Sequence, residues 1–314
     1  MNKKIINLTK KALEKSRALK IYGSITGRKH VILGFHRICS NGLPVNSFDT
    51  CPTIELKLFR EILIYVKQHY NILPLSEFYK IRDLDKPLAA ITFDDGWRDN
   101  YDLAFPVLQG LKVPATIFVT TGKIGTDEPF WQQMLGKTFK EFMGMGKSRE
   151  QENFKKLLGI EEKVVLTQDF LEKTTHQWKS LSSADLKEKV DLLRNYCKDF
   201  RGTRCFLNIE EIQEMLRFGI EFGTHSINHL ILSKEPDAIV ETELSGSKKT
   251  LEKVVGKLVD MLAYPDGGLN DRVVEIARDL GYKVGCTTKA GYACKRDDPM
   301  RLPRLGYPLE FTSR

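Results

Sequence analysis

Short runs of apolar residues alternate along most of the chain with stretches in which apolar residues recur every three or four positions. The short runs predict buried strands at 31–38, 72–75, 89–93, 115–119, 220–224, 261–264, 283–287 and 301–305. The helical spacing predicts helices at 54–69, 99–110, 209–218, 237–255 and 271–280. Strands that alternate with helices are typical of a parallel sheet. The pattern therefore favours an α/β protein, either a parallel barrel of about seven strands or a doubly wound sheet.

Residues 125–207 interrupt this alternation. They contain amphipathic stretches, 141–158 and 185–200 among them, and little sign of strands. The pattern predicts a helical insertion into a barrel domain that spans 30–314. We expect the insertion to lie as a cap beside the functional site.

The composition is that of an ordinary soluble protein, with 314 residues of which 41% are hydrophobic and 29% are charged. No apolar run approaches the roughly 20 residues of a membrane-spanning helix, and the N-terminus lacks the roughly 7–15 apolar residues of a secretory signal. We therefore expect a cytoplasmic protein. The six cysteines form no Cys-x-x-Cys pair. This favours reduced thiols, although an even number also permits disulfides.

The net charge of +8 lies entirely within residues 1–29, which hold nine of the 49 Lys and Arg residues and one acid, Glu14. Ile5, Leu8 and Leu19 share one side of a helical projection. The segment predicts a basic, amphipathic surface helix that contacts an anionic membrane. The alternatives are a solvated helix packed on the domain and, as a minor option, a contact with nucleic acid.

Two adjacent acids, Asp94 and Asp95, follow the apolar run at 89–93 and precede Gly96. In a parallel α/β sheet or barrel, functional groups gather at the C-terminal ends of the strands. Two carboxylates at such an end repel each other unless a cation or a proton intervenes. Asp-Asp-Gly is also a common turn sequence, so the pair alone leaves a functional and a structural interpretation open.

A pair of histidines, His225 and His229, follows the predicted strand at 220–224 and supports the functional interpretation. Their spacing places both rings on one face of a helix, or else a tight turn brings them together, since Gly223 and Asn228 favour irregular backbone. In either case both imidazoles can reach one cation. Two histidines and one carboxylate leave positions open for water and substrate, which is typical of catalytic metal sites.

Asp94 and Asp95 would then divide the work, because adjacent residues at a strand end point in different directions. One binds the metal, and the other takes a proton from the water that attacks a carbonyl. The leaving group also needs an acid. His36, at the end of the first strand, is the best remaining candidate, and the alternative is a buried structural histidine with a satisfied hydrogen bond.

Two motifs carry a resemblance to a known family. Thr-Phe-Asp-Asp-Gly at 92–96 and His-Ser-Ile-Asn-His at 225–229 resemble the first two motifs of the polysaccharide deacetylase family, the NodB-homology or carbohydrate esterase family 4 group. The resemblance covers roughly 30–122 and 206–307. It implies a distorted (β/α) barrel, one divalent metal ion that is often zinc, and hydrolysis of N-acetyl groups on amino sugars. By resemblance Asp94 is the catalytic base, and the metal ligands are Asp95, His225 and His229.

The chain departs from the family pattern in its third motif. Residues 263–267 read Ala-Tyr-Pro-Asp-Gly where Arg-x-Pro-aromatic-Gly is common, so the arginine that orients the base is missing there, as in a subset of members. We expect Tyr264 and Asp266 near the oxyanion or the substrate, with the backbone N–H of Asp266 as the oxyanion donor. Asp266 stands where an aromatic residue is usual, which leaves the sugar-binding wall undefined.

A second departure concerns the acid. A late Leu-x-His motif is absent, and Phe-His-Arg at 35–37 instead resembles a Tyr-His-Arg element on the first strand of a subgroup, where a histidine takes that role. The closing Arg-Leu-Pro-Arg at 301–304 also resembles that subgroup. This similarity supports His36 as the general acid.

The sequence thus predicts a metal-dependent N-deacetylase that acts on an acetylated amino sugar of a cell-envelope glycan or its lipid-linked precursor, at the inner face of the cytoplasmic membrane. The alternatives are an O-acetyl esterase, an amidase for a non-sugar substrate, and a degenerate barrel that only binds glycan or a partner protein. The intact set of Asp94, Asp95, His225 and His229 argues against a degenerate barrel.

Overall fold

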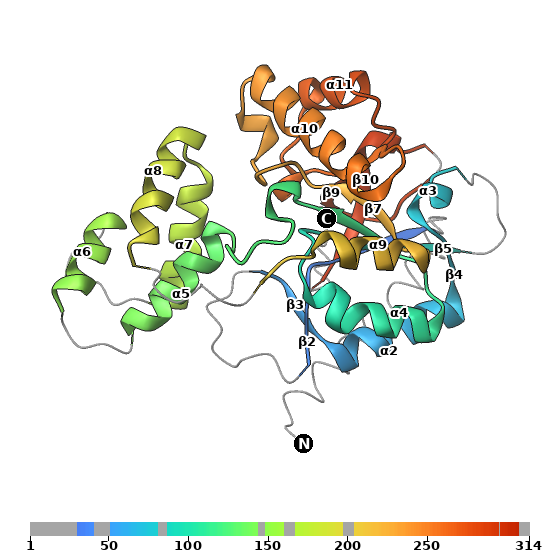
Figure 1. Ribbon diagram of the computed structural model, residues 1–314, viewed down its shortest axis with the longest axis horizontal. Helices are drawn as coiled ribbons and strands as arrows, with labels where there is room; N and C mark the ends of the chain where they lie inside the picture. The colour runs from blue at the N-terminus through green and yellow to red at the C-terminus, as the bar shows by residue number, and fades with distance from the viewer. Residues whose placement is uncertain are drawn as a thin grey trace. The chain divides into compact units, whose positions relative to one another are not determined.

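The computed structural model describes most of the chain between its termini. The described ranges are 30–40, 51–80, 87–143, 148–159, 167–196, 204–294 and 296–307. Contacts divide these residues into two units (Figure 1). The first unit takes the described residues of 30–40, 53–124 and 206–307, and the second takes those of 125–205 together with 51–52. The basic segment 1–29 lies outside the described residues.

The first unit is a closed parallel barrel (Figure 1). Among the described strands, β1 pairs with both β5 and β10, and every neighbouring pair around the ring is parallel. Seven strands form the ring: β1 (Val31–Phe35), β5 (Leu88–Phe93), β6 (Thr116–Val119), β7 (Glu221–Thr224), β8 (Met261–Ala263), β9 (Val284–Ala290) and β10 (Leu302–Gly306). The short β4 (Asn71–Ile72) adds to the start of β5. The predicted parallel barrel is confirmed, and the doubly wound sheet is excluded because β1 joins the two ends of the sheet.

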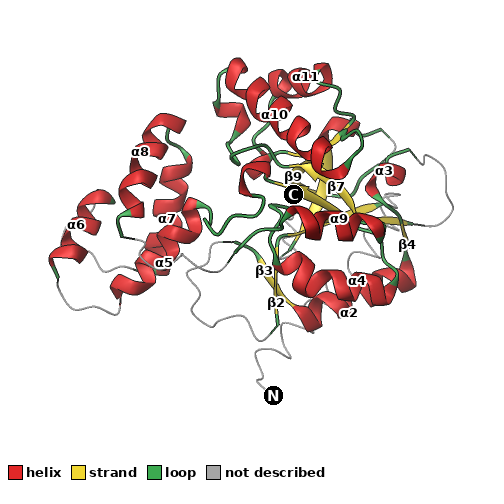
Figure 2. Ribbon diagram, in the orientation of Figure 1, coloured by secondary structure: helices red, strands yellow, loops and turns green. Residues whose placement is uncertain are grey.

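Helices follow the strands along the chain and surround the barrel (Figure 2). The α-helices of this unit are α2 (Leu56–His69), α3 (Leu75–Phe78), α4 (Phe105–Leu111), α9 (Ile209–Arg217), α10 (Asp237–Val255) and α11 (Asp271–Asp279). Short 3₁₀ turns lie at η2 (Thr121–Lys123), η3 (Leu232–Lys234), η4 (Pro265–Gly267) and η5 (Pro299–Arg301). No described helix is long and apolar enough to cross a bilayer.

The predicted helix at 99–110 is built in two parts. A π-helical turn, η1 (Asn100–Ala104), leads directly into α4. Pro106 lies in the first turn of α4, directly after the π-helical turn, so its missing N–H falls where one helix type passes into the other. The helix continues to Leu111, and the early helix end that a proline can cause does not occur here.

The predicted strand at 31–38 is interrupted at His36. β1 ends at Phe35, and β2 (Arg37–Cys39) leaves the barrel to pair in parallel with β3 (Thr53–Glu55). The Phe35 carbonyl still accepts the N–H of Asp94 in the parallel pairing with β5, so the chain leaves the barrel only after this hydrogen bond. His36 thus sits at the rim of the barrel between two strands.

Alternate residues of β5 pack against two different layers. Ile91 and Phe93 belong to the hydrophobic cluster that α2 and α4 share with the outside of the barrel. Ala90 belongs to a second cluster, which takes residues from most strands of the ring and fills the barrel. The same alternation directs Thr92 and Asp94 toward the barrel interior, above this filling.

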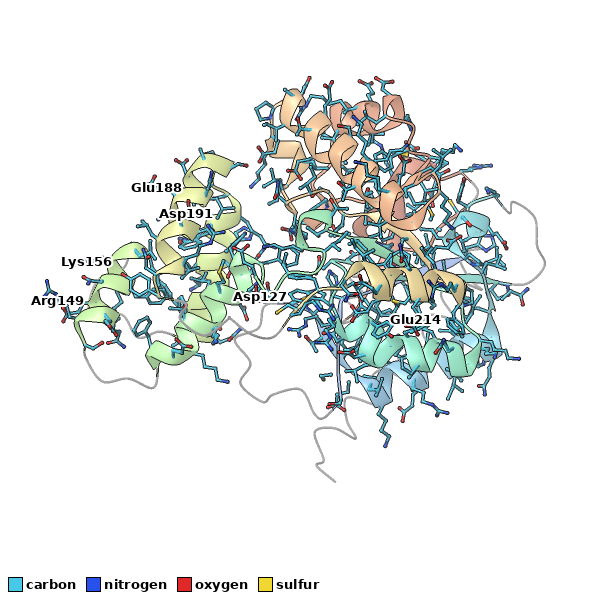
Figure 3. All side chains as sticks on the ribbon, in the orientation of Figure 1. Asp127, Arg149, Lys156, Glu188, Asp191 and Glu214 are labelled. Carbon is cyan, nitrogen blue, oxygen red and sulfur yellow. The ribbon has the colours of Figure 1, made fainter. Side chains whose placement is uncertain are left out.

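The second unit is helical. It contains α5 (Trp131–Met143), α6 (Arg149–Leu157), α7 (Gln168–Lys179) and α8 (Ser183–Arg194). Leu135, Phe139, Phe154 and Trp178 form the centre of its own hydrophobic cluster. Charged side chains such as Arg149, Lys156, Glu188 and Asp191 extend from its helices into solvent (Figure 3).

The helices of this unit differ in extent from the prediction. The stretch 141–158, predicted as one helix, divides between α5 and α6, and Ser148 caps the start of α6 by accepting the N–H of Gln151. The position of this helical unit as a cap beside the functional site stays a prediction.

Candidate active site

The predicted site residues lie at the C-terminal ends of barrel strands. His36 follows β1, Asp94 and Asp95 follow β5, and His225 and His229 follow β7. Because these strands are parallel, their C-terminal ends share one rim. The barrel therefore brings together residues that lie almost 200 positions apart in the sequence.

Asp95, His225 and His229 converge on one point. Asp95 Oδ1 lies 3.5 Å from His225 Nε2 and 3.4 Å from His229 Nε2. One ligand atom from each residue lies within 4.8 Å of the other two. Ligands about 2.0–2.1 Å from a tetrahedral zinc ion are separated by about 3.3 Å. The three side chains thus fit a divalent metal ion, and they leave the rest of its coordination sphere to water and substrate.

The two histidines lie on a turn and not on a helix, which settles the alternative that the sequence left open. Ser226 and His229 have φ angles of 61° and 59°, in the left-handed region that residues other than glycine seldom occupy. Asp95 has the same hand, with φ of 75°, and Gly96 follows it with φ of 80°. Left-handed backbone thus places two of the three ligands.

A buried carboxylate holds the histidine turn. Glu243, which is 3% exposed on α10, accepts the backbone N–H groups of Ile227 and Asn228, each at 2.9 Å, and the side-chain amide of Asn228 at 2.7 Å. Within the turn, the N–H of His229 donates to Ser226 Oγ. Glu243 is not among the residues predicted from the sequence, because its only signal there is an acid on the largely apolar face of a predicted helix.

His225 is held in the form that binds metals. Its Nδ1 lies 2.8 Å from the carbonyl oxygen of Ala263, so Nδ1 carries the proton and the lone pair of Nε2 faces Asp95. Burial disfavours the charged imidazolium and lowers the pKa of His225 to about 4. A neutral imidazole with a free Nε2 is the ligand that a divalent ion requires.

Asp94 is held by an arginine that the sequence analysis did not assign. Arg304 on β10 donates from Nη1 to Asp94 Oδ1 and from Nη2 to Oδ2, both at 2.7 Å. Its Nε donates to the carbonyl oxygen of Thr287, and Nη1 also reaches Thr92 Oγ1. Both members of the pair are almost fully buried. An arginine of the last strand thus holds Asp94, and the third motif contains no arginine.

Arg304 also fixes the charge of Asp94. Burial by itself raises the pKa of this carboxyl, but the charge and hydrogen bonds of Arg304 outweigh burial and hold the pKa below its ordinary value. Asp94 is ionised at neutral pH and turned toward the rim. The only signal in the sequence was the Arg-Leu-Pro-Arg run at 301–304, whose resemblance to a subgroup named no role for it.

His36 lies beside this pair. Its Nε2 is 3.9 Å from Asp94 Oδ2, and 29% of its side chain is exposed. Its Nδ1 is buried and has no hydrogen-bond partner within the described residues. The carbonyl oxygen of His36 accepts the side-chain amide of Asn100 at 2.8 Å, which fixes the backbone at the end of β1. A partly exposed imidazole beside a carboxylate can exchange a proton with a bound molecule.

The two third-motif residues are placed differently from each other. The Tyr264 ring is fully buried in a core cluster and its hydroxyl donates to the carbonyl oxygen of Met300, so the phenol supports the fold and does not face substrate. Asp266 is exposed in the turn after β8, with left-handed φ of 51°. Its role as an oxyanion donor stays a prediction.

A parallel barrel that carries an Asp-His-His set and an arginine-held aspartate at one rim fits a metal-dependent hydrolase fold, and comparison with known families tests this. The family profile for polysaccharide deacetylase matches residues 81–285, about two thirds of the chain, and the chain belongs to this family.

Individual relatives agree with this assignment. The poly-beta-1,6-N-acetyl-D-glucosamine N-deacetylase of Staphylococcus aureus is 23% identical over 81% of this chain and 67% of its own length. The peptidoglycan-N-acetylglucosamine deacetylase of Bacillus cereus is 34% identical over 30% of this chain, and the match spans about half of that relative, 46%. The solved structure of the Streptococcus pyogenes deacetylase PplD in complex with acetate matches with a TM-score of 0.59 and 22% identity, over 88% of this chain and 92% of that one. At this identity the structural match supports the fold alone.

Proposed function

We propose that the protein is a divalent-metal-dependent hydrolase that removes N-acetyl groups from an amino sugar of a cell-envelope glycan or its lipid-linked precursor. The observation that carries the proposal is the arginine-held Asp94 next to the set of Asp95, His225 and His229. The two curated relatives named above support it, since both are named as N-acetylglucosamine deacetylases.

When bound, a divalent ion supplies Lewis-acid polarisation of the acetyl carbonyl and activates water for attack. Asp95, His225 and His229 would hold it. The two histidines and one carboxylate suit zinc, which we propose as the native ion.

Asp94 acts as the base. The oxygen of water bonds to the acetyl carbon while Asp94 accepts the proton that the water loses. Arg304 orients the carboxylate through two parallel hydrogen bonds and keeps it ionised before the reaction. The same pairing makes Asp94 a weaker base than an isolated buried carboxylate.

His36 completes the reaction. When the C–N bond breaks, the bonding electrons go to the nitrogen, which needs a proton to leave as an amine. Nε2 of His36 lies near Asp94 on the same rim and is partly exposed, so it can donate that proton to the leaving nitrogen. Acetate and the free amino sugar are the products.

The test is a screen for acetate release from free, polymeric and lipid-linked N-acetyl sugars, each with and without a strong chelator. We expect release from at least one of these substrates, and loss of release with chelator. Release from O-acetylated sugars alone would show an esterase, and release from a non-sugar amide alone would show an amidase. Binding of glycan without release of acetate from any substrate would show a barrel that only binds.

We also propose that the basic segment 1–29 contacts an anionic membrane surface at the cytoplasmic face. All of the net charge of +8 lies in this segment, and each Lys or Arg near such a surface contributes about 1 kcal/mol. Deletion of 1–29 should release the protein from anionic vesicles. Equal vesicle binding by the shortened protein, or salt-dependent binding to DNA in preference to vesicles, would refute the membrane contact.

A further inference from the structure

We propose that Trp97 is a positioning residue that favours binding of the metal through one oxygen of Asp95. The inference rests on the metal site of the proposed function, and goes beyond it by assigning a role to residues next to the ligands. It concerns the affinity and geometry of the site and is independent of the substrate.

The two oxygens of Asp95 have different partners. Oδ1 faces Nε2 of both His225 and His229, at 3.5 and 3.4 Å. Oδ2 accepts a hydrogen bond from the indole Nε1 of Trp97 at 2.8 Å. The indole N–H competes with a bound ion for Oδ2 and leaves Oδ1 to the histidine side. The indole N–H therefore favours binding through Oδ1 alone and keeps that oxygen aimed at the histidines.

Local backbone brings the indole to this position. Asp95 and Gly96 are both left-handed, which turns the chain sharply and returns the side chain of Trp97 onto the carboxylate two residues earlier. Gly96 is also confined by its neighbour, because a Cβ atom there would lie 3.1 Å from Val119 Cγ1. The turn thus serves both the ligand and the group that orients it.

The indole is itself held in place. Trp97 is 1% exposed and stacks on Phe206, with ring centroids 4.5 Å apart and an angle of 23° between the planes. The guanidinium carbon of Arg37 lies 4.6 Å from the centroid of the indole. Arg37 is fixed in turn by its Nε, which donates to Asp99 Oδ2 at 3.0 Å. Rotation of the indole away from Asp95 would break these contacts.

These contacts tie the metal ligand to the strand end of the proposed acid. Arg37 directly follows His36, and the N–H of Ile38 donates to Asp99 Oδ1 at 3.0 Å. Asn100, one residue after Asp99, donates to the carbonyl oxygen of His36 at 2.8 Å. The loop after β5 and the end of β1 are therefore one hydrogen-bonded assembly.

The test measures metal affinity of the metal-free protein by competition with a chromophoric chelator, without any substrate. Trp97 is replaced by benzothienylalanine, which keeps the shape of indole but has sulfur in place of N–H, and separately by Trp97→Phe. Loss of a group that orients a metal ligand typically weakens affinity by about 10–100-fold. We expect a loss in this range from both replacements. The same two changes at Trp178, in the core of the helical unit, are the matched controls and should leave affinity unchanged.

The electronic spectrum of the cobalt-substituted protein supplies a second readout. A carboxylate that becomes bidentate raises the coordination number, so we expect the d–d bands to weaken in the Trp97 replacements and to stay unchanged in the Trp178 controls. Benzothienylalanine keeps the packing, so the test does not depend on whether Trp97→Phe folds well. An affinity within twofold of the wild type together with an unchanged cobalt spectrum would overturn the proposal.

The outcomes also separate this inference from the proposed function. A wild-type protein that binds no divalent ion would overturn both. Tight binding that is insensitive to Trp97 would overturn only the positioning role. A sensitive site in a protein that releases no acetate would support the positioning role and overturn the proposed reaction.

Discussion

The two ends of strand β7 hold polar groups in opposite ways. At its start, Glu221 is half-buried and accepts hydrogen bonds from the N–H of Ser76 and from the hydroxyl groups of Ser76 and Thr116. Just beyond its end, His225 and His229 meet a carboxylate on a turn of left-handed residues. At the N-terminal end of β7, neutral groups with ordinary backbone angles donate hydrogen bonds to the carboxylate. At the C-terminal rim, charged groups and left-handed backbone lie close together.

The difference shows which part of the barrel contains groups that lower the free energy of unfolding. Burying the pair of Asp94 and Arg304 carries a desolvation cost that its Coulombic attraction does not always offset, and left-handed backbone at Asp95 and His229 adds strain. Such groups persist where chemistry needs them. Changes at the C-terminal rim should therefore affect metal binding and turnover, and changes at the N-terminal end of β7 should affect stability alone.

The largest effect should come from His225→Ala. Two protein ligands would remain, so most of the bound metal should be lost and acetate release should fall to background. Elemental analysis of the purified variant and an acetate assay measure both quantities. A variant that keeps one ion per chain and normal turnover would show that His225 is not a ligand.

Asp94→Asn should lower turnover by about 10²–10⁴ while the metal stays bound. The amide keeps the shape of the carboxylate but cannot accept the proton of the attacking water. Metal content measured on the same sample is the control, because unchanged metal separates loss of the base from loss of the ion. Turnover near that of the wild type would place the base elsewhere.

His36→Ala should slow amide hydrolysis by about 10²–10⁴ and keep both metal and fold. The loss should shrink for an activated ester, since its leaving group departs without a proton. Comparing the two substrates in one variant isolates the acid step from general damage. Equal losses on both substrates, or no loss on either, would return His36 to a structural role.

Arg304→Met should destabilise the protein by about 3–5 kcal/mol at pH 7, because it leaves the Asp94 charge buried without the two hydrogen bonds of the guanidinium. Unfolding in urea measures this loss. The double variant Asp94→Asn with Arg304→Met should recover much of it, because no unpaired charge remains. A stable single variant would mean that solvent or another cation compensates Asp94.

The same pair makes a pH prediction. Because Arg304 holds the pKa of Asp94 below its ordinary value, the pair stabilises the wild type fully above the unfolded pKa of about 4 and loses that effect as the pH falls through the lower folded pKa. In Arg304→Met, the two largest effects that lower the pKa of Asp94 are lost, so burial raises this pKa against only the weaker effects of His225 and His36. The stability deficit of the variant should therefore shrink on acidification, and a deficit that is constant between pH 7 and pH 5 would contradict this account.

The smallest effect should come from the N-terminal end of β7. Glu221→Gln keeps an acceptor but removes its charge, so we expect a loss of about 1 kcal/mol in the free energy of unfolding and no change in turnover. Urea unfolding and the acetate assay measure the two quantities. A change in turnover of this variant would contradict the division between the C-terminal rim and the N-terminal end of the barrel.

Much of this architecture follows from the sequence. Period and length identify the strands, and the ends of two strands carry Asp94, Asp95, His225 and His229, so a shared rim follows once the sheet is parallel. The structure brings Asp95, His225 and His229 together. The spacing predicts that one of the two adjacent acids joins the histidines, and the choice of Asp95 follows from the resemblance to the deacetylase family. Local pattern also fixes most helix bounds to within a few residues, as for 237–255.

Other features depend on how the barrel closes. Arg304 and Asp94 lie 210 positions apart, and they meet only because β10 pairs with β1 and β1 with β5. No local pattern encodes that contact. Glu243 reaches the histidine turn from a helix, so its spacing predicts only a helix face. The burial of the Tyr264 ring could not be predicted from the sequence either. Its motif suggests a substrate contact, and the residues that bury the ring come from distant parts of the chain.

The most direct test of the metal-dependent mechanism is a titration of the metal-free protein with zinc. Acetate release from an N-acetyl sugar that the wild type accepts is measured at each addition, and bound zinc is measured on the same samples. The account predicts that activity rises in proportion to bound zinc and reaches its plateau at one ion per chain, held by Asp95, His225 and His229. Full activity in the metal-free protein, or zinc binding without any gain in activity, would contradict it.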